Sequence, residues 1–220
     1  MPVKVKICGV RTPDIVTAAA EEGADYVGFV FFERSPRHLT FAQAKALAAA
    51  ARGKIGTVAV VVDPENALLD GIVDAMRPDL LQLHGKETPE RVAAIKLRAG
   101  LPVMKAISVA AADDVAKAVE YAATADYVLF DSKASSGVAL QGGNGVAFDW
   151  RALNSVTTPF ALSGGLNVDN VGEAIRVTGA SFVDVSSGVE RVPGEKDESL
   201  VRRFIRAAKA TAPQRRAKAS

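Results

Sequence analysis

Apolar residues along the chain follow two patterns that alternate with each other. Short apolar runs are each followed by a longer segment whose apolar residues recur every three to four positions. In the first run, residues 3–8, the apolar positions alternate with Lys4, Lys6 and Cys8, which therefore share one face of a predicted strand. Further strands are expected at 26–31, 54–62, 79–83, 102–107, 126–130, 159–162 and 181–185. Helices are expected at 12–22, 41–51, 64–76, 88–100, 111–123, 167–177 and 197–210.

The order of these elements predicts the fold. About eight strand–helix cycles follow one another without a linker, which is the pattern of an α/β protein with a single (β/α)₈ TIM barrel. The rival is an open doubly wound sheet, whose first turn is usually glycine-rich. Here that turn reads Cys8-Gly9-Val10-Arg11 and lacks the fingerprint. We therefore expect a barrel over residues 1–210 and a flexible basic tail over 211–220.

One long segment interrupts the alternation. Residues 132–146 read SKASSGVALQGGNGV. They show neither the alternation typical of a strand nor the three-to-four-residue spacing typical of a helix. Long irregular segments in compact domains are usually functional or disordered, and this one follows the predicted sixth strand, at the end of the barrel where active sites lie. A mobile lid over the substrate is favoured, and an idle surface loop is the alternative.

Composition narrows the class of protein. Of 220 residues, 49% are hydrophobic and 6% aromatic, so an aliphatic core is expected, and a net charge of +2 implies no nucleic-acid surface. Cys8 is the single cysteine, which fits a reducing compartment. Without a leader pattern or a membrane-length apolar run, we expect a soluble cytoplasmic protein with no membrane partner, monomeric or homodimeric. One cysteine and two histidines, His38 and His84, do not make a metal-ligand set.

Two turns near the C-terminal end favour an anion. The seventh predicted strand ends at Ser163-Gly164-Gly165 and the eighth at Ser186-Ser187-Gly188. Glycine lets the backbone approach a ligand and turn its N–H groups toward it, and serine adds hydroxyl donors. In barrels, the loops after strands seven and eight commonly bind phosphate. The pair of turns therefore predicts a phosphate site, although either turn alone is explained as well by a tight connection.

Other polar residues stand where predicted strands end. Cys8 could act as a base or nucleophile if a cation such as Lys6 favours its thiolate, and inert packing is the alternative. Asp131 ends the sixth strand with no helical pattern after it, so an acid–base role is favoured over a helix cap. Gln82 and His84, which share one face of the fourth strand, are further candidates, and so is Lys105. Asp184 precedes Ser186 by two residues on the same strand face and is expected to pair with a lysine. Arg37 is a candidate ligand for a carboxylate.

Motifs along nearly the whole chain resemble one family. They are KICG at 6–9, GFVF at 28–31, SPR at 35–37, LHG at 83–85, LFD at 129–131, FDW at 148–150, SGGL at 163–166 and DVSSGVE at 184–190. In this order they are similar to phosphoribosylanthranilate isomerase of tryptophan biosynthesis. One departure is GGNGVA at 142–147, where the family often carries a lysine, so the contacts of the lid are expected to differ.

The resemblance implies a reaction and roles for residues. The reaction is a cofactor-free Amadori rearrangement of N-(5-phosphoribosyl)anthranilate to 1-(2-carboxyphenylamino)-1-deoxyribulose 5-phosphate. The resemblance implies that Cys8 is the general base and Asp131 the general acid. It also implies that Arg37 holds the anthranilate carboxylate and that the last two loops hold the phosphate. The chemistry of the residues agrees, because opening the sugar ring needs an acid and the resulting Schiff base must then lose a proton to a base.

Two alternatives stay open at this point. The related isomerase of histidine biosynthesis performs the same rearrangement on another aminophosphoribosyl substrate, but that family uses an aspartate where this chain has Cys8. A phosphate-sugar binding barrel without turnover is the second alternative, and the presence of both Cys8 and Asp131 argues against it.

Overall fold

Eight parallel strands close into a barrel. The computed structural model describes residues 2–132, 149–156 and 158–211. The strands are β1 (Lys4–Cys8), β2 (Tyr26–Phe31), β3 (Gly56–Val61), β4 (Leu80–Leu83), β5 (Val103–Val109), β6 (Tyr127–Ser132), β7 (Ala161–Leu162) and β8 (Phe182–Val185). Neighbours in sequence pair in parallel, and β8 pairs with β1 to complete the ring. The expected (β/α)₈ barrel is confirmed.

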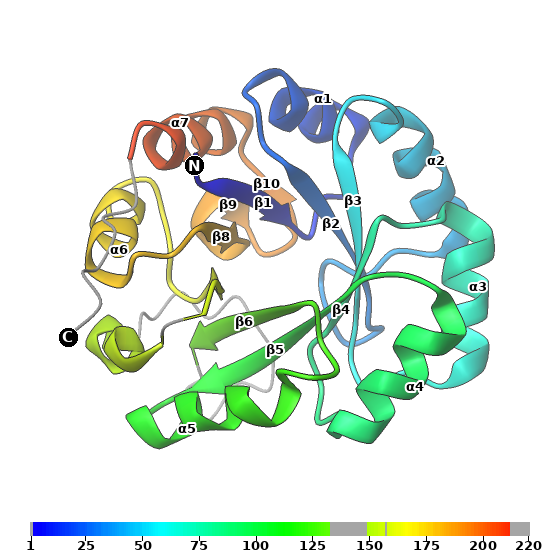
Figure 1. The fold of residues 1–220 in the computed structure, drawn as a ribbon. Helices are drawn as coiled ribbons and strands as arrows, with labels where there is room; N and C mark the ends of the chain where they lie inside the picture. Colours follow the sequence, from blue (N-terminus) through cyan, green and yellow to red (C-terminus); the bar gives the residue numbers. More distant parts are fainter. Residues whose placement is uncertain (1, 133–148, 157, 212–220) are drawn as a thin grey trace.

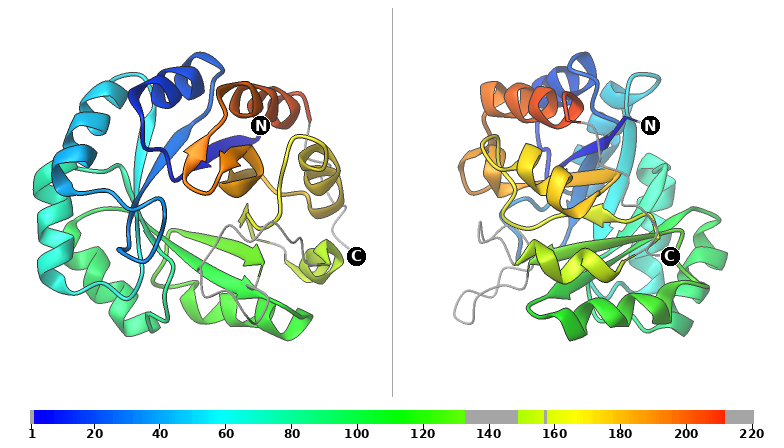
Figure 2. Two further views of the ribbon diagram at one scale, coloured as in Figure 1. Left: turned by 180° about the vertical axis from the view of Figure 1, so that it is seen from behind. Right: turned by 60° about the vertical axis from the view of Figure 1, so that its left-hand side comes forward.

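The helices form a ring outside the strands (Figure 1). They are α1 (Pro13–Glu21), α2 (Phe41–Ala51), α3 (Asn66–Met76), α4 (Pro89–Ala99), α5 (Ala112–Ala116), α6 (Val171–Thr178) and α7 (Glu198–Lys209). Short 3₁₀ helices are η1 (Lys117–Tyr121), η2 (Trp150–Ser155) and η3 (Ser187–Val189). Seen from behind in Figure 2, the last helix, α7, again lies beside the first, α1. None of the helices in the described residues is long and apolar enough to cross a membrane.

Two features differ from the sequence-based expectation. The helix expected over 111–123 divides into α5 and the tighter η1, and the Tyr121 hydroxyl at the end of η1 donates to the Glu87 backbone oxygen at 3.0 Å. Such a tertiary contact is invisible to periodicity. After β8, an antiparallel hairpin of β9 (Glu190–Val192) and β10 (Glu195–Lys196) was not expected. Beyond Ser132, the expected lid lies outside the described residues, as does the expected tail beyond Thr211.

Side chains alternate between the two faces of each strand, so the protein has two separate cores. One face packs against the helices, and the other fills the barrel. The interior set is Cys8, Val30, Val58, Val60, Leu80, Met104, Ala106, Leu129, Ala161 and Phe182. At the amino ends of the strands this interior is aromatic, with Phe182 stacked on Tyr26 at 5.7 Å between ring centroids. Toward the carboxyl ends it becomes polar, because Leu80 is followed by Gln82, Leu129 by Asp131, and Phe182 by Asp184 on the same strand faces.

A repeated aspartate ties the amino ends of neighbouring strands together. An aspartate just before each of β2, β4 and β6 accepts the backbone N–H of the preceding strand. The pairs are Asp25 with Val5 at 2.8 Å, Asp79 with Thr57 at 2.7 Å, and Asp126 with Val103 at 2.8 Å. The carboxylate replaces a ladder partner where the strands start, so this end of the barrel is a stability feature.

Candidate active site

Polar side chains from β1, β4, β6 and β8 meet at the carboxyl end of the barrel. At the base of this cluster, Lys6 donates to both carboxylate oxygens of Asp184, at 2.9 and 3.0 Å. Both residues are buried, with exposures of 0% and 3%. Burial alone would lower the pKa of Lys6, but the Asp184 carboxylate raises it above its ordinary value, so the ammonium stays charged. Lys6 is the lysine partner expected for Asp184.

Cys8 lies one step above Lys6 on the same face of β1 and is 8% exposed. Burial raises the pKa of the Cys8 thiol, and the nearby Lys6 ammonium opposes that rise without reversing it. Lys6 therefore favours the thiolate in the expected direction, but burial has the larger effect on the pKa of Cys8. The Asp184 carboxylate, which is paired with Lys6, adds a smaller rise in the pKa of Cys8 to that caused by burial.

Asp131, 3% exposed at the end of β6, is the terminus of a hydrogen-bonded chain. Its Oδ2 lies 3.1 Å from His84 Nε2, and His84 Nδ1 lies 3.1 Å from Gln82 Nε2. With the Gln82 amide as donor to Nδ1, the proton of a neutral His84 is on Nε2 and is donated to Asp131. The fourth strand and its loop thus orient the carboxyl group of the sixth.

Arg37 is buried, and its guanidinium is held by an acidic partner. Nε and Nη2 donate to the two oxygens of Glu190, each at 2.7 Å. Lys196 donates to Glu190 Oε1 at 2.7 Å and to the Ser186 backbone oxygen at 3.0 Å. Burial would raise the pKa of Glu190, but the two cations hold it at about 2. Burial lowers the pKa of Lys196 to about 8.

Sequence reasoning missed the roles of Glu190 and Lys196. Glu190 stood inside the DVSSGVE motif, but nothing local linked it to Arg37, from which it is 153 positions away. A buried lysine directly across a hairpin from a buried glutamate, Lys196 against Glu190, would have been a usable signal once the hairpin was recognised.

The two glycine-rich turns pack against each other, as the phosphate hypothesis requires. Gly164 and Gly165 have φ of +88° and +67°, where a side chain is strained. A Cβ on Gly188 would overlap the Leu166 backbone oxygen. Within the described chain, the N–H groups of Gly164, Gly165, Ser187 and Gly188 have no hydrogen-bond acceptor. Unpaired backbone N–H groups on two adjacent turns suit an anion.

Ser186 contributes differently from the expectation. Its hydroxyl donates to the Cys8 backbone oxygen at 3.2 Å, so it joins the eighth strand to the first instead of standing free as a phosphate donor. Lys105 is also removed from the candidates. It is on the helix-facing side of β5, where it pairs with Glu87 at 2.8 Å and donates to the Gly85 backbone oxygen at 2.8 Å.

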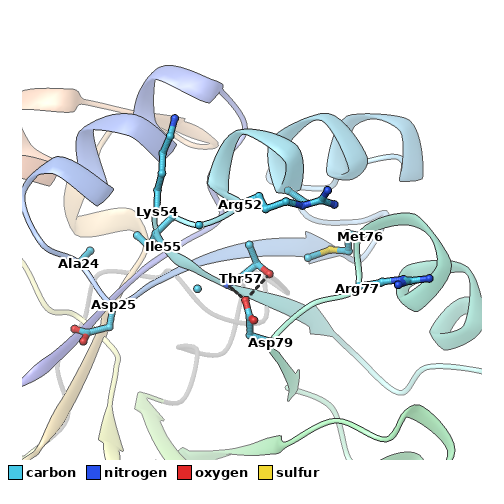
Figure 3. A pocket seen from close by; sticks show the side chains of 12 residues that line it. Ala24, Asp25, Arg52, Lys54, Ile55, Thr57, Met76, Arg77 and Asp79 are labelled. Carbon is cyan, nitrogen blue, oxygen red and sulfur yellow. Dashed lines mark hydrogen bonds between the residues drawn. The ribbon is translucent and has the colours of Figure 1, made fainter.

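A surface hollow of about 790 Å³ lies at the other end of the barrel, among the loops that precede β2, β3 and β4 (Figure 3). In this view Arg52 and Arg77 both extend to the right and Lys54 extends upward, and Asp79 is bonded to Thr57. The buried polar side chains that bond to one another lie instead at the carboxyl end, which is therefore the candidate site. The described residues contain no group of three or more histidine, cysteine, aspartate and glutamate residues that could hold a metal ion.

The fold and this cluster define a class: a (β/α)₈-barrel enzyme with acid–base groups at the carboxyl ends of its strands. The sequence profile of the N-(5'-phosphoribosyl)anthranilate (PRA) isomerase family matches residues 5–207. The chain belongs to this family.

Individual relatives agree. The N-(5'-phosphoribosyl)anthranilate isomerase of Rhodopseudomonas palustris (strain BisA53) is 54% identical over 213 residues, 96% of this chain and 98% of that protein. The crystal structure of phosphoribosyl anthranilate isomerase from Thermotoga maritima superimposes with a TM-score of 0.85 at 34% identity, covering 94% of this chain and 99% of the other. A crystal structure of such an isomerase in complex with reduced 1-(o-carboxyphenylamino)-1-deoxyribulose 5-phosphate gives 0.82 at 33% identity, with coverage of 94% and 99%.

Proposed function

We propose that this chain isomerises N-(5'-phosphoribosyl)anthranilate to 1-(2-carboxyphenylamino)-1-deoxyribulose 5-phosphate, the Amadori step of tryptophan biosynthesis. Membership of the family supports the reaction. The observation that carries the assignment of residues is that Cys8 and Asp131 come from the tips of two different strands and face one polar cluster, with the Lys6–Asp184 pair beneath it. An acid and a base can then act on a single bound sugar.

In the first step, Asp131 is the acid. A proton passes from its carboxyl group to the ring oxygen of the sugar, the bond between that oxygen and C1 breaks, and the amine lone pair forms the C1–N double bond. Asp131 is left as a carboxylate. His84 stabilises that carboxylate and holds it in place by donating the Nε2 proton to Asp131 Oδ2, with 3.1 Å between the two heavy atoms.

In the second step, Cys8 is the base. Its thiolate removes the proton from C2, and the C–H electrons form the C1–C2 double bond while the nitrogen becomes neutral. Burial raises the pKa of the thiol and so opposes formation of the thiolate. The buried cations Lys6 and Lys196 both favour the thiolate. The resulting enol becomes the ketone by taking a proton at C1, which the Cys8 thiol can return, and by losing the proton of its C2 hydroxyl group, which restores the protonated Asp131.

Two further groups hold the substrate. The free N–H groups of Gly164, Gly165, Ser187 and Gly188 suit the phosphate. Arg37 suits the anthranilate carboxylate because Glu190 takes only its Nε and one Nη2 hydrogen. Among described residues, Nη1 is without an acceptor, so the second edge of the guanidinium can make its own bidentate pair.

The test is a progress curve of phosphoribosylanthranilate fluorescence with the purified protein. Loss of the substrate signal and appearance of the carboxyphenylamino-deoxyribulose phosphate are expected. The aminophosphoribosyl substrate of the histidine pathway, offered in parallel, should not be converted. Binding of the anthranilate substrate without turnover would instead indicate a non-catalytic barrel, and conversion of the histidine-pathway substrate alone would support the alternative isomerase.

A further inference from the structure

The unexpected hairpin β9–β10 lies against the segment that carries Arg37. Gly194, in the turn of the hairpin at φ +86°, is so close to the Pro36 backbone oxygen that a Cβ would lie 2.6 Å from it. Below the turn, Lys196 faces Glu190 across the hairpin. The hairpin therefore reaches the Arg37 segment by a backbone contact as well as by a charge pair.

The Arg37 side chain is enclosed on its other side by the loop after β1. The Arg37 methylene next to Nε occupies the place that a Cβ on Gly9 would take, and Gly9 directly follows Cys8. The Arg37 backbone N–H donates to the Ser35 hydroxyl at 3.2 Å, which shapes the turn before it. Contact with Gly9 thus fixes the methylene part of the Arg37 side chain, and Glu190 fixes its guanidinium group.

The Glu190 carboxylate accepts hydrogen bonds from two cations, Arg37 and Lys196. Its side chain is 4% exposed and accepts two hydrogen bonds from Arg37 and one from Lys196, all at 2.7 Å. One carboxylate between two cations leaves a net charge of +1 in the cluster. A free edge of Arg37 with surplus positive charge is what a ligand carboxylate requires, and a planar fork has only one orientation when its other edge is held.

We propose that Glu190 is a positioning residue for carboxylate recognition: it holds Arg37 by one edge so that the other edge is presented to the anthranilate carboxylate. Lys196 supports this by balancing Glu190 from the opposite strand of the hairpin. The hairpin is then part of the specificity apparatus of the site. This inference rests on the proposed function, because that function supplies the carboxylate.

The test is calorimetric binding of two ligands that differ only in the carboxylate. One is reduced 1-(o-carboxyphenylamino)-1-deoxyribulose 5-phosphate, and the other is its aniline analogue, which keeps the sugar and the phosphate. Glu190→Gln should weaken the carboxylate ligand by about 10-fold or more, the scale of a lost charge-assisted hydrogen bond, and leave the analogue unchanged. Glu190→Asp, which keeps the charge but shortens the reach, should give a smaller loss and serves if the amide variant folds poorly.

The matched control is Glu195→Gln, the same chemical change in the same hairpin. Glu195 is exposed and pairs with Arg191, so neither ligand should be affected. The second control is a double-mutant cycle. If Glu190 acts through Arg37, then Glu190→Gln should cost nothing further in an Arg37→Ala background.

Three results would overturn the inference: unchanged affinity for the carboxylate ligand in Glu190→Gln, equal weakening of both ligands, or an undiminished loss in the Arg37→Ala background. The last two would mean a purely structural glutamate. Failure of the unaltered protein to bind the carboxylate ligand would overturn the proposed function as well. Normal binding without turnover would overturn the proposed function alone, because affinity does not depend on catalysis.

Discussion

At the scale of the residue, the environment of Cys8 makes a prediction about pH. Burial raises the pKa of the thiol above its ordinary value, so the reactive thiolate increases as the pH rises through that raised pKa. Because Cys8 is the single cysteine, alkylation by iodoacetamide followed by mass spectrometry reports this group alone. We expect the alkylation rate to keep rising with pH beyond the range in which an ordinary cysteine thiol titrates. A plateau near neutral pH would show a stabilised thiolate and contradict the assignment of a resting thiol.

The two proton-transfer residues should differ in how much activity their replacement removes. Asp131→Asn keeps the shape and the contact with His84 but cannot supply a proton, so kcat should fall by roughly 10²–10⁴-fold. Cys8→Ser should lose at least as much, because a hydroxyl supplies almost no anion near neutral pH. Steady-state kinetics on the folded variants measures both. Affinity for the reduced product analogue is the control and should persist, and near-native turnover of Cys8→Ser would move the base to another residue.

Residue chemistry that depends on distant partners could not be predicted from the sequence. The positions of Cys8, Gln82, Asp131 and Asp184 followed from strand alternation, which is a local pattern. Which cation faces which anion was not local, since Lys6 and Asp184 are 178 positions apart. That is why the lysine partner of Asp184 could not be named from the sequence, and why the partner of Arg37 was missed.

At the scale of the element, the turn after β7, which contains Gly164 and Gly165, allows a prediction about KM. Gly165→Val should raise KM strongly, because a side chain at φ +67° would stand among the N–H groups proposed to hold the phosphate. Backbone strain is separated from this effect by Gly100→Val. Gly100 has a similar φ of +63° at the end of α4, with no atom within 4 Å of an added Cβ. Its replacement should lower stability and leave KM unchanged, and an unchanged KM in Gly165→Val would remove the phosphate from this turn.

Asp79 offers a test at the opposite end of the same architecture. Asp79→Ala removes the acceptor of the Thr57 N–H at 2.7 Å and of its hydroxyl at 3.0 Å. The loss should cost about 1–3 kcal/mol of unfolding free energy, or a few degrees of Tm per kcal/mol. The control is Asp70→Ala, which breaks an exposed pair with Arg98 and should change Tm far less. Thermal unfolding measures both, and kcat at 25 °C should be native because neither lies near the site.

Elements were predicted well where a pattern is local and poorly where it is not. All eight strands were placed within a few residues because lumen and helix faces alternate along each of them. The hairpin β9–β10 was missed because its strands span three and two residues, too short for any period. Its contacts with distant residues, the Glu190–Arg37 pair and the approach of Gly194 to Pro36, are tertiary and leave no local pattern.

At the scale of the whole molecule, the last elements of the chain contact the first ones in both the sheet and the surrounding ring of helices. Parallel pairing of β8 with β1 joins the ends of the sheet, and α7 joins the ends of the helical ring by packing on α1. Arg202 and Arg206 of α7 reach Glu22 at the end of α1, while Lys209 pairs with Asp25 at 2.7 Å. The inner face of α7 is fully buried, through Val201, Phe204, Ile205 and Ala208. The last described turn, at Thr211, bonds back to α7 through its hydroxyl at 2.9 Å.

Two truncations therefore test how much of the C-terminal end the barrel needs. A protein ending at Thr211 keeps every closing contact named above, so its Tm should stay within about 1–2 °C of the full chain and its kcat should be native. A protein ending at Asp197 loses α7 and exposes the apolar surfaces of α1, α6 and β1 that α7 covers. It should show no cooperative thermal transition, because the barrel then lacks both its last helix and the apolar packing between that helix and the strands. Circular dichroism melting measures both, and a cooperative transition in the shorter protein would mean that strand pairing alone closes the fold.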